Sequence, residues 1–530
     1  MTTKWIDFKQ VPQLSYKDVA YTVEKPEIMP FYNFRPGIES FKQAIEERQK
    51  HNVNRKLLVE ILDEQYATFS KSIAVNRNIQ LLKQVNTFTI ITAHQPSLFT
   101  GPLYYIYKII STIHLCKKLA AQYPDYQFVP VFVTGGEDHD FEEVNYIHLF
   151  GKKLVWENEQ KGSVGMMSTQ SLEPVLEELK ELVGNSELGK EIFQVIQSAY
   201  TQNKIYSKAT IQLVHELFKE FGLVVFNMNH KDLKKGFIPI IKEEMFNRPS
   251  KALVQATADE LLKINFKPQA YPRDINFFYI RKNLRERIVL EDNLYKVLNT
   301  DLAFTQEEMA QEIEQYPERF SPNVVMRPLF QQHTLPNLAY IGGGGEIAYW
   351  LERKTQFEHF GVFFPMLIRR NSVLWIDKSN YKKIKKLGLQ TDELFSDADS
   401  VIRNYVERQS TQTLEISQEK EIIRKSFEQI AEKGKKIDPT LEKAILAEQT
   451  KQMKLLDQLE SRLVRSEKQK HETALKQIRS LKEKLFPGNG LQERHDNLLG
   501  FYLKYGRRFF DVLLEHLDPL KKQFLVIVDE

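Results

Sequence analysis

Two short apolar runs separated by an amphipathic segment predict the centre of the fold. Residues 87–92 (TFTIIT) and 128–135 (FVPVFVTG) are rich in β-branched and aromatic side chains, which is typical of buried strands. Between them, residues 103–122 carry apolar side chains at helical spacing and lysines towards the end, which suit a helix C-terminus. Strand, helix and strand in this order make a βαβ unit, so the sequence predicts a parallel sheet and an α/β fold.

Later segments extend this pattern. Residues 338–342 (LAYIG) predict a strand that runs through four glycines into a helix. The remaining predicted strands lie at 222–228, in a hairpin at 276–280 and 287–292, and at 362–370 and 373–377.

A different pattern follows near the C-terminal end. Residues 440–486 contain neither Gly nor Pro, and Asp438-Pro439 and Pro487-Gly488 give a helix start and a helix stop. Apolar residues at three- and four-residue steps fit a coiled-coil seam, and an amphipathic helix packed on its own chain explains them equally well. With a shorter helix at 416–433 and a turn at 433–438, the sequence predicts an antiparallel helical hairpin.

The predicted organisation therefore has several parts. They are a mostly helical lead-in packed on the core (1–85), the α/β core (86–150 and 320–380), an inserted or connecting region (151–319), the helical hairpin (381–490) and a C-terminal segment that folds back on the core (491–530).

Composition narrows the class of protein. Hydrophobic residues make up 42% and charged residues 27% of the 530-residue chain, which excludes a mostly disordered protein. The net charge of only +4 argues against a protein that coats nucleic acid. Cys116 is the only cysteine, so a disulfide scaffold and a CxxC zinc site are excluded. Because the chain has neither a signal-peptide pattern nor an apolar run of about 20 residues, we expect a cytoplasmic protein without membrane contact.

Three segments at predicted strand ends could hold a ligand, since ligands of open α/β sheets bind beyond the carboxyl ends of the strands. The first joins a strand to a helix and contains His94, Gln95 and Gly101. The helix N-terminus there suits a phosphate or a carboxylate, and His94 could donate a proton or a hydrogen bond to it. A structural histidine in a loop is the alternative.

The second segment is an unusually dense cluster of ionisable residues, Glu137, Asp138, His139 and Asp140, directly after a strand and two glycines. The carboxylates could bind a substrate ammonium group or Mg²⁺, and His139 could act as a general acid or base. One imidazole without a thiolate makes a zinc site the weaker interpretation. A solvated turn remains the simpler alternative.

The third segment is the glycine run Gly342, Gly343, Gly344 and Gly345, whose amides could cradle an anion. It is neither a Walker A loop nor a GxGxxG fingerprint, and a tight turn is the alternative. Two arginines outside these segments, Arg273 and Arg369, could clamp a carboxylate bidentately or form surface ion pairs.

Five stretches spread over residues 92–498 resemble one family, the cysteine ligase of bacillithiol biosynthesis. They are TAHQPSLFTGPLYYIYKIIS, VPVFVTGGEDHDFEEVNY, YPRDINFFYI, the block from SPNVVMRPLFQQ through AYIGGGGEIAYW to LIRR, and LFPGNGLQERHDNL. One departure is visible at the first loop. Family members usually carry Thr-Gly-Gln-Gln where this chain has Thr92-Ala93-His94-Gln95, so the family role transfers to Gln95 rather than to His94.

The resemblance implies a Rossmann-like core similar to class I aminoacyl-tRNA synthetases and nucleotidyltransferases, and a coiled-coil domain that makes a homodimer. It also implies a reaction that joins the carboxyl group of L-cysteine to the amine of glucosaminyl malate. This would be the last step in making the low-molecular-weight thiol bacillithiol.

Because a carboxylate is a poor electrophile, we expect activation by ATP or another nucleotide, with Mg²⁺ as a candidate ion and no zinc. In this hypothesis the first and third segments bind phosphate or carboxylate. Glu137 and Asp138 bind the cysteine ammonium group or a metal, His139 transfers protons, and Arg369 or Arg273 binds the malyl carboxylates.

Two alternatives remain open at this point. One is a nucleotidyltransferase or ligase that acts on another carboxylate, and the other is a dimeric coiled-coil binding protein without catalysis. Both enzymatic hypotheses require the three segments to line one common cavity.

Overall fold

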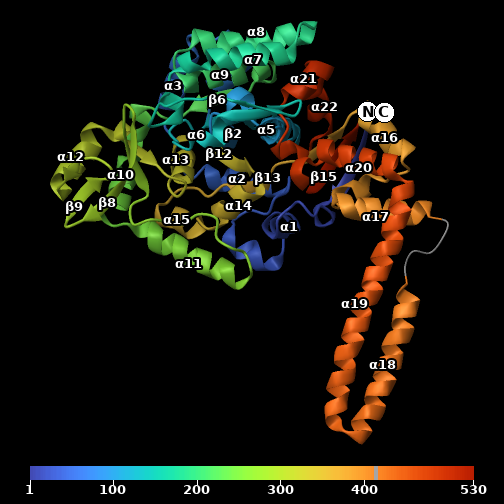
Figure 1. Ribbon diagram of the computed structural model, residues 1–530. Helices are drawn as coiled ribbons and strands as arrows, with labels where there is room; N and C mark the ends of the chain where they lie inside the picture. The colour runs from blue at the N-terminus through green and yellow to red at the C-terminus, as the bar shows by residue number, and fades with distance from the viewer. Residues whose placement is uncertain (411–415) are drawn as a thin grey trace. The chain divides into compact units, whose positions relative to one another are not determined.

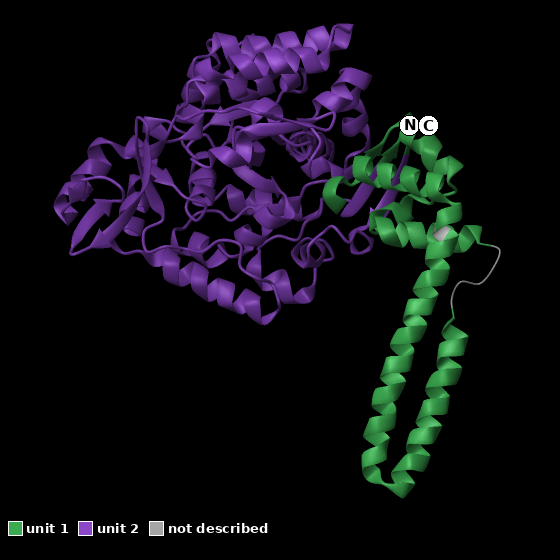
Figure 2. Ribbon diagram, in the orientation of Figure 1, with its two compact units in different colours: residues 1–2, 375–491, 527–530 green, residues 3–374, 492–526 purple. Residues whose placement is uncertain are grey.

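A computed structural model describes residues 1–410 and 416–530, and the chain divides into two compact units (Figure 2). The Rossmann-like unit comprises residues 3–374 and 492–526. The helical unit comprises residues 1–2, 375–491 and 527–530.

A parallel five-stranded sheet forms the centre of the Rossmann-like unit (Figure 1). In spatial order its strands are β13 (Met366–Arg369), β12 (Asn337–Gly342), β2 (Thr87–His94), β3 (Gln127–Thr134) and β6 (Val224–Asn227). All four neighbouring pairs are parallel, which confirms the predicted α/β fold. Numbered along the chain the order is 3-2-1-4-5, so the winding direction reverses between β2 and β12.

Apolar clusters cover both faces of this sheet, which explains why its strands read as nearly continuous apolar runs. On one face Phe88 and Ile90 of β2 pack with Leu115 of helix α5 (Tyr104–Gln122) and Ile45 of α2 (Ser40–Arg48). The next residue, Ile91, joins the cluster on the opposite face, as the two-residue period of a strand requires. The predicted helix at 103–122 is α5.

A second sheet, entirely antiparallel, has the order β10-β9-β8-β7-β11. The predicted hairpin is confirmed as β7 (Phe277–Arg281) and β8 (Leu284–Glu291), joined through Asn283 at a positive φ of 60°. The other strands are β9 (Leu294–Val297), β10 (Ala303–Phe304) and β11 (Phe320–Pro322).

The remaining strands form two small sheets, β4-β5 and β1-β15-β14, and further helices surround the central sheet. These strands are β1 (Thr2–Asp7), β4 (Tyr146–Leu149), β5 (Lys152–Val155), β14 (Val373–Ile376) and β15 (Gln523–Val528). The helices are α1 (Tyr16–Thr22), α3 (Arg55–Tyr66), α4 (Ile73–Leu81), α6 (Phe141–Val144), α7 (Glu173–Val183), α8 (Glu187–Gln202), α9 (Tyr206–Phe218), α10 (Lys231–Phe246), α11 (Pro249–Lys263), α12 (Gln306–Gln315), α13 (Arg327–Thr334), α14 (Gly344–Leu351), α15 (Lys354–His359), α21 (Leu499–Tyr505) and α22 (Arg508–His516).

Two expected features of the organisation differ from the structure. The region 151–319 is not only a connection, because its strand β6 pairs with β3 in the central sheet. The lead-in 1–85 is mostly helical but begins with strand β1. The pattern at 222–228 predicts the strand β6 but not its partner β3, and the short strand β1 likewise depends on pairing with a distant segment. Of the predicted C-terminal segment 491–530, residues 492–526 belong to the Rossmann-like unit, and residues 491 and 527–530 belong to the helical unit.

The helical unit contains the predicted antiparallel hairpin, formed by α18 (Ser417–Ile437) and α19 (Pro439–Lys470) (Figure 1). Asp438 starts α19 as expected, since its side chain accepts a hydrogen bond from the Thr440 amide at 2.8 Å. The predicted helix at 440–486 is interrupted at His471, whose φ and ψ are −112° and 19°, and continues as α20 (Glu472–Leu485).

The helical unit is completed by α16 (Lys378–Lys386) and α17 (Ala398–Gln409). Residues 411–415 of the predicted hairpin domain lie outside the described residues. Over the described parts of the chain, no helix combines the length and the apolar character that crossing a bilayer demands.

Candidate functional site

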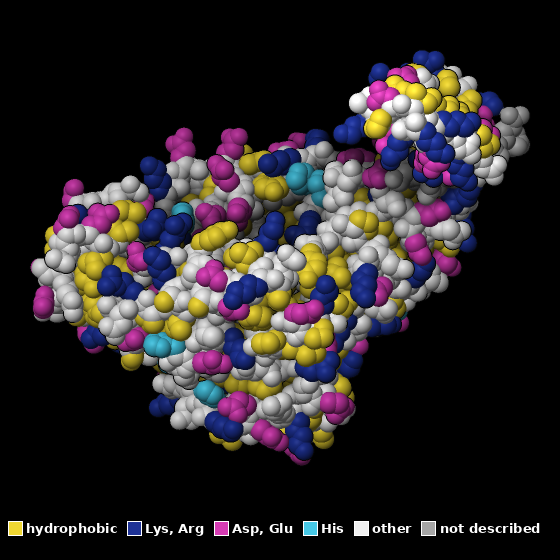
Figure 3. Space-filling view, turned by 90° about the horizontal axis from the view of Figure 1, so that it is seen from below, with side chains coloured by type: hydrophobic (Ala, Val, Ile, Leu, Met, Phe, Trp, Pro, Cys, Tyr) yellow, Lys and Arg dark blue, Asp and Glu magenta, His cyan; other side chains and the backbone are white. Residues whose placement is uncertain are grey.

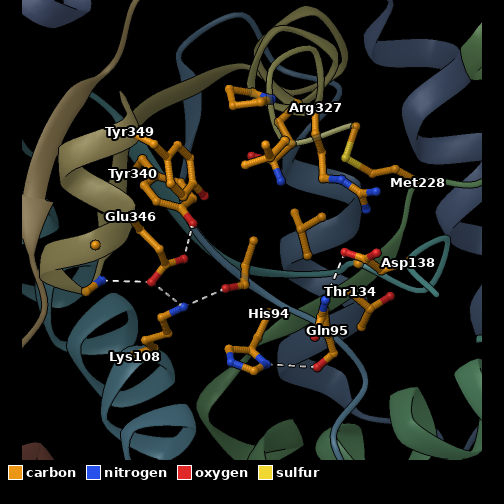
Figure 4. Close-up of a pocket in the computed structure, with 18 of the residues that line it drawn as sticks. His94, Gln95, Lys108, Thr134, Asp138, Met228, Arg327, Tyr340, Glu346 and Tyr349 are labelled. Carbon is orange, nitrogen blue, oxygen red and sulfur yellow. Dashed lines mark hydrogen bonds and ion pairs between the residues drawn. The ribbon is translucent and has the colours of Figure 1, made fainter. Parts of the chain in front are cut away.

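A cavity of about 440 Å³ opens at the carboxyl end of the central sheet, where the strand order reverses between β2 and β12 (Figure 4). The loops that follow β2, β3 and β12 all contribute to its wall, so the three segments singled out in the sequence converge on one hollow. The sequence-predicted residues that line it are His94, Gln95, Glu137, Asp138, Gly343, Gly344 and Gly345.

A buried ion pair lies at the reversal point. Lys108 of α5 places its Nζ 2.6 Å from a carboxylate oxygen of Glu346, the third residue of α14. Lys108 also donates to the Ala93 carbonyl at 2.8 Å, and Glu346 accepts from the Tyr340 hydroxyl at 2.6 Å. Burial alone would raise the pKa of Glu346, but Lys108 and these hydrogen bonds outweigh it and lower the pKa, so the carboxyl is ionised.

The glycine run provides close backbone approach rather than an open nest of amides. The Gly343 amide donates to Glu346 at 2.8 Å and is therefore already satisfied. A Cβ on Gly344 would lie 1.8 Å from a carboxylate oxygen of Asp18, so only glycine fits there. The Gly344 and Gly345 amides, in the first turn of α14, have no intrahelical carbonyl acceptor and remain candidates for anion binding.

His94 is a half-buried, neutral hydrogen-bonding group in the cavity wall. Its Nδ1 lies 3.0 Å from the Gln95 carbonyl, which can only accept, so Nδ1 carries the proton and Nε2 accepts from the Tyr104 hydroxyl at 3.1 Å. Burial, reinforced by nearby Lys108, lowers the pKa of His94 to about 4. His94 therefore fixes the loop after β2 instead of exchanging protons at neutral pH.

Asp138 is the carboxylate on the β3 side of the cavity. It accepts from the Gln95 side chain at 2.8 Å and from the His139 amide at 2.9 Å, and it lies 3.4 Å from an Arg285 nitrogen. Burial would raise the pKa of Asp138, but Arg327, Arg285 and these hydrogen bonds lower it overall. Asp138 is therefore ionised at neutral pH.

The other members of the acidic cluster have different surroundings. Glu137 lines the cavity but forms an ion pair with the fully buried Lys234, so its charge is already matched. His139 and Asp140 do not line it, and the Nδ1 of His139 contacts the Arg285 guanidinium. Ligand atoms of Asp138, His139 and Asp140 lie within 4.8 Å of one another. A metal ion bound there would have to displace the positive charge of Arg285.

Besides His139 and Asp140, four predicted residues lie away from the cavity wall. Gly342 precedes it, and Gly101 ends a turn at a positive φ of 61°. Arg369 is buried and pairs with Asp18 at 2.8 Å, so it braces the fold and does not face a substrate. Arg273 is exposed and outside the lining. The interpretation as a malyl clamp therefore does not fit Arg369, whereas that of Arg273 stays a prediction.

The neighbouring Arg370 does line the cavity. It is fully buried, with one nitrogen 2.8 Å from the Glu493 carboxylate, and Glu493 itself is fully buried. The Nε of Arg370 has no hydrogen-bond partner among the described residues and lies near Gly343. An unpartnered buried donor beside the α14 N-terminus fits a phosphate or carboxylate oxygen.

Several cavity residues carry no local sequence signal, because they lie inside amphipathic helices or apolar strands. A lysine in the middle of α5 reads as an ordinary helix residue, and a tyrosine in β12 reads as core. The missed lining residues include Tyr104, Lys108, Thr134, Asn227, Met228, Arg327, Tyr340, Tyr349 and Arg494. These residues are far apart in the sequence, and the fold brings them to one cavity.

The fold and the cavity define a Rossmann-like α/β protein with a charged ligand crevice at its switch point. Two family models match the chain. They are the Rossmann-like N-terminal domain of bacillithiol biosynthesis BshC over residues 1–371 and its C-terminal coiled-coil domain over residues 373–528. The chain belongs to the BshC family of bacillithiol biosynthesis, and it is a ligase. The family resemblance seen in the sequence is thus confirmed.

Full-length relatives carry the name "Putative cysteine ligase BshC". The protein of Flavobacterium psychrophilum is 41% identical, with 99% of each chain covered, and that of Flavobacterium johnsoniae is 40% identical, with 99% of this chain and 100% of the relative covered. A Bacillus anthracis relative is 29% identical over 93% of this chain and 94% of its own. A solved structure titled as an arginyl-tRNA synthetase of Campylobacter jejuni covers 88% of this chain and 99% of its own at 12% identity. Its TM-score of 0.23 is too low to carry an argument.

Proposed function

We propose that this ligase joins the carboxyl group of L-cysteine to the amine of glucosaminyl malate, the last step of bacillithiol formation in the cytoplasm. The observation that carries the proposal is the charged cavity at the switch point, in a chain whose full-length relatives are named cysteine ligases. Its volume of about 440 Å³ lies within the usual range for small-molecule sites.

The cysteine carboxylate must be activated before an amine can attack it, and we propose ATP as the co-substrate. The carboxylate oxygen would attack a phosphorus atom, releasing pyrophosphate or ADP, and the amine would then displace AMP or phosphate from the acyl carbon. The groups that fit the phosphates are the Gly344 and Gly345 amides and the unpartnered Nε of Arg370. Mg²⁺ bound with the nucleotide would supply further positive charge.

The test is incubation of the protein with L-cysteine, glucosaminyl malate and ATP–Mg²⁺, with mass-spectrometric detection of the amide. We expect nucleotide-dependent product, together with either AMP or ADP, which identifies the activated species. Reactions without nucleotide or without cysteine are the controls. Absence of the amide from the complete mixture, or equal amounts without nucleotide, would contradict the proposal.

We further propose that the α18–α19 hairpin mediates a homodimer. Large apolar side chains along both helices are exposed, and Figure 3 shows apolar side chains among charged ones on the hairpin. These residues are Ile422, Ile430, Ile437, Leu441, Leu446, Leu455, Leu459 and Leu463. Sedimentation analysis should give a dimer, and Leu455→Lys combined with Leu459→Lys should give a monomer. A monomeric wild-type protein would refute this part.

A further inference from the structure

Most charged side chains around the cavity are neutralised within the chain. Lys108 pairs with Glu346, Lys234 with Glu137, and Arg370 with Glu493. Buried ion pairs of this kind are costly to break, because the remaining partner is left as an uncompensated charge. They are therefore poor candidates for groups that must exchange one partner for a substrate.

Arg327 is different. It is the first residue of α13, lines the cavity and is only partly buried. One of its nitrogens donates to the Pro322 carbonyl at 3.1 Å, and no carboxylate of the described residues lies within 4.0 Å of its guanidinium. Since a guanidinium has five donors in a planar fork, Arg327 has spare donors, and its charge acts on the nearby Asp138 without a direct ion pair.

An ionised carboxylate lies near this cation. Asp138 also lines the cavity, and one of its oxygens lies 3.4 Å from a nitrogen of the buried Arg285. Because a carboxylate has about four acceptor sites and 27% of this side chain is exposed, Asp138 can accept a further donor without losing Arg285. Figure 4 shows the Arg327 guanidinium extending towards Asp138, with the Met228 side chain beside it. Met228 follows β6 and forms an apolar part of the same wall.

We propose that Arg327 and Asp138 form an α-amino-acid clamp, in which Arg327 binds the α-carboxylate, Asp138 binds the α-ammonium group and Met228 contacts the side chain of the bound amino acid. The clamp rests on the proposed function, since it assigns the place of its cysteine substrate. It adds two residues, Arg327 and Met228, that carry no signal in the sequence.

The charge pattern favours an amino acid over other anions. A phosphate or a dicarboxylate near Arg327 would bring a second negative charge close to Asp138, which costs free energy at low dielectric. A zwitterion instead gives each protein charge its opposite. With the amino acid bound there, the nucleotide phosphates would bind on the α14 side of the cavity, next to Arg370.

The clamp can be tested by removing one group from the ligand and one from the protein. Calorimetric titrations would compare L-cysteine with cysteamine, which lacks the carboxylate, and with 3-mercaptopropionate, which lacks the amine, each with and without ATP–Mg²⁺. The proteins are the wild type, Arg327→Gln, Arg327→Lys and Asp138→Asn. Arg287→Gln, an exposed arginine outside the cavity lining, is the matched control.

Loss of one charge-assisted contact should weaken L-cysteine binding about tenfold to hundredfold in Arg327→Gln and in Asp138→Asn. Arg327→Gln should leave cysteamine binding unchanged, and Asp138→Asn should leave 3-mercaptopropionate binding unchanged. Arg327→Lys should be intermediate, because it keeps the charge but loses the planar fork. Arg287→Gln should bind all three ligands as the wild type does.

Three results would overturn the clamp. They are no heat from L-cysteine in either condition, a wild type that binds both analogues as tightly as L-cysteine, and an Arg327→Gln protein that loses cysteamine as much as L-cysteine. The comparison within the wild type stands even if a variant does not fold. If the wild type prefers L-cysteine over both analogues but does not ligate it, the proposed function is refuted and the clamp is kept. If it ligates L-cysteine without that preference, the clamp is refuted and the proposed function is kept.

Discussion

Replacing His94 by glutamine removes a half-buried imidazole whose pKa lies far below that of free histidine. In the folded chain burial and Lys108 lower this pKa to about 4, against 6.5 in the unfolded chain. Between these two values the unfolded chain binds a proton that the folded chain does not. Stability is therefore present in full above the unfolded pKa and is lost as the pH falls towards the folded pKa.

The size of the effect follows from proton linkage. At pH 7.5 the imidazole is neutral in the folded and the unfolded chain, so its protonation changes the unfolding free energy by almost nothing. At pH 5 the unfolded chain is mostly protonated at this position, and the folded state loses about 2 kcal/mol of unfolding free energy through His94 alone. His94→Gln keeps an uncharged hydrogen-bonding side chain and abolishes this loss.

The assay is differential scanning calorimetry of wild type and His94→Gln at pH 7.5 and pH 5. Other buried histidines are present in both proteins and cancel in the difference. For a cooperative unit of about 400 residues, 2 kcal/mol corresponds to roughly 2 °C, so the variant should gain that much on the wild type when the pH is lowered. If the difference in melting temperature between the two proteins is the same at pH 7.5 and pH 5, the lowered pKa of His94 is refuted.

Two further predictions concern stability around the same cavity. Lys108→Met removes the cation 2.6 Å from the Glu346 carboxylate, which is partly exposed and keeps its bonds from Tyr340 and Gly343, so it should cost about 1–3 kcal/mol of unfolding free energy. Adding Glu346→Leu should recover part of the lost unfolding free energy, measured by urea titration. A double variant as unstable as Lys108→Met alone would contradict the pairing. Gly344→Ala places a Cβ 1.8 Å from Asp18 and should cost at least about 3 kcal/mol, whereas Gly345→Ala, with its nearest atom at 3.6 Å, should melt close to the wild type. Equal melting temperatures for the two alanine variants would contradict this difference.

The elements that the sequence predicts well are those with a local physical cause. The run at 87–92 is rich in β-branched side chains and the helix at 103–122 is long and periodic, and they appear as β2 and α5. The start of α19 follows from a capping aspartate and a proline at the first helical position, both of which act locally. The break at His471 has no such signal, since no glycine or proline marks it.

The candidate site divides in the same way. Strand-end loops with glycines and charges are visible in the sequence, and the structure brings His94, Asp138 and the glycine run to one cavity. What the sequence does not contain is the pairing of charges across long separations. Arg369 resembles a free clamp until Asp18 is found beside it, and Lys108 resembles a surface lysine until Glu346 is found 2.6 Å away.

This pairing determines what the cavity can recognise. Each buried pair holds its partners in fixed positions and contributes little field beyond itself, because its charges are opposite and close together. The selectivity of the cavity therefore depends on the few charges that form no such pair, and Arg327 is one of them among the described residues. Because Arg327 forms no internal ion pair among the described residues, the favourable free energy of a ligand contact with it is not offset by the breaking of such a pair.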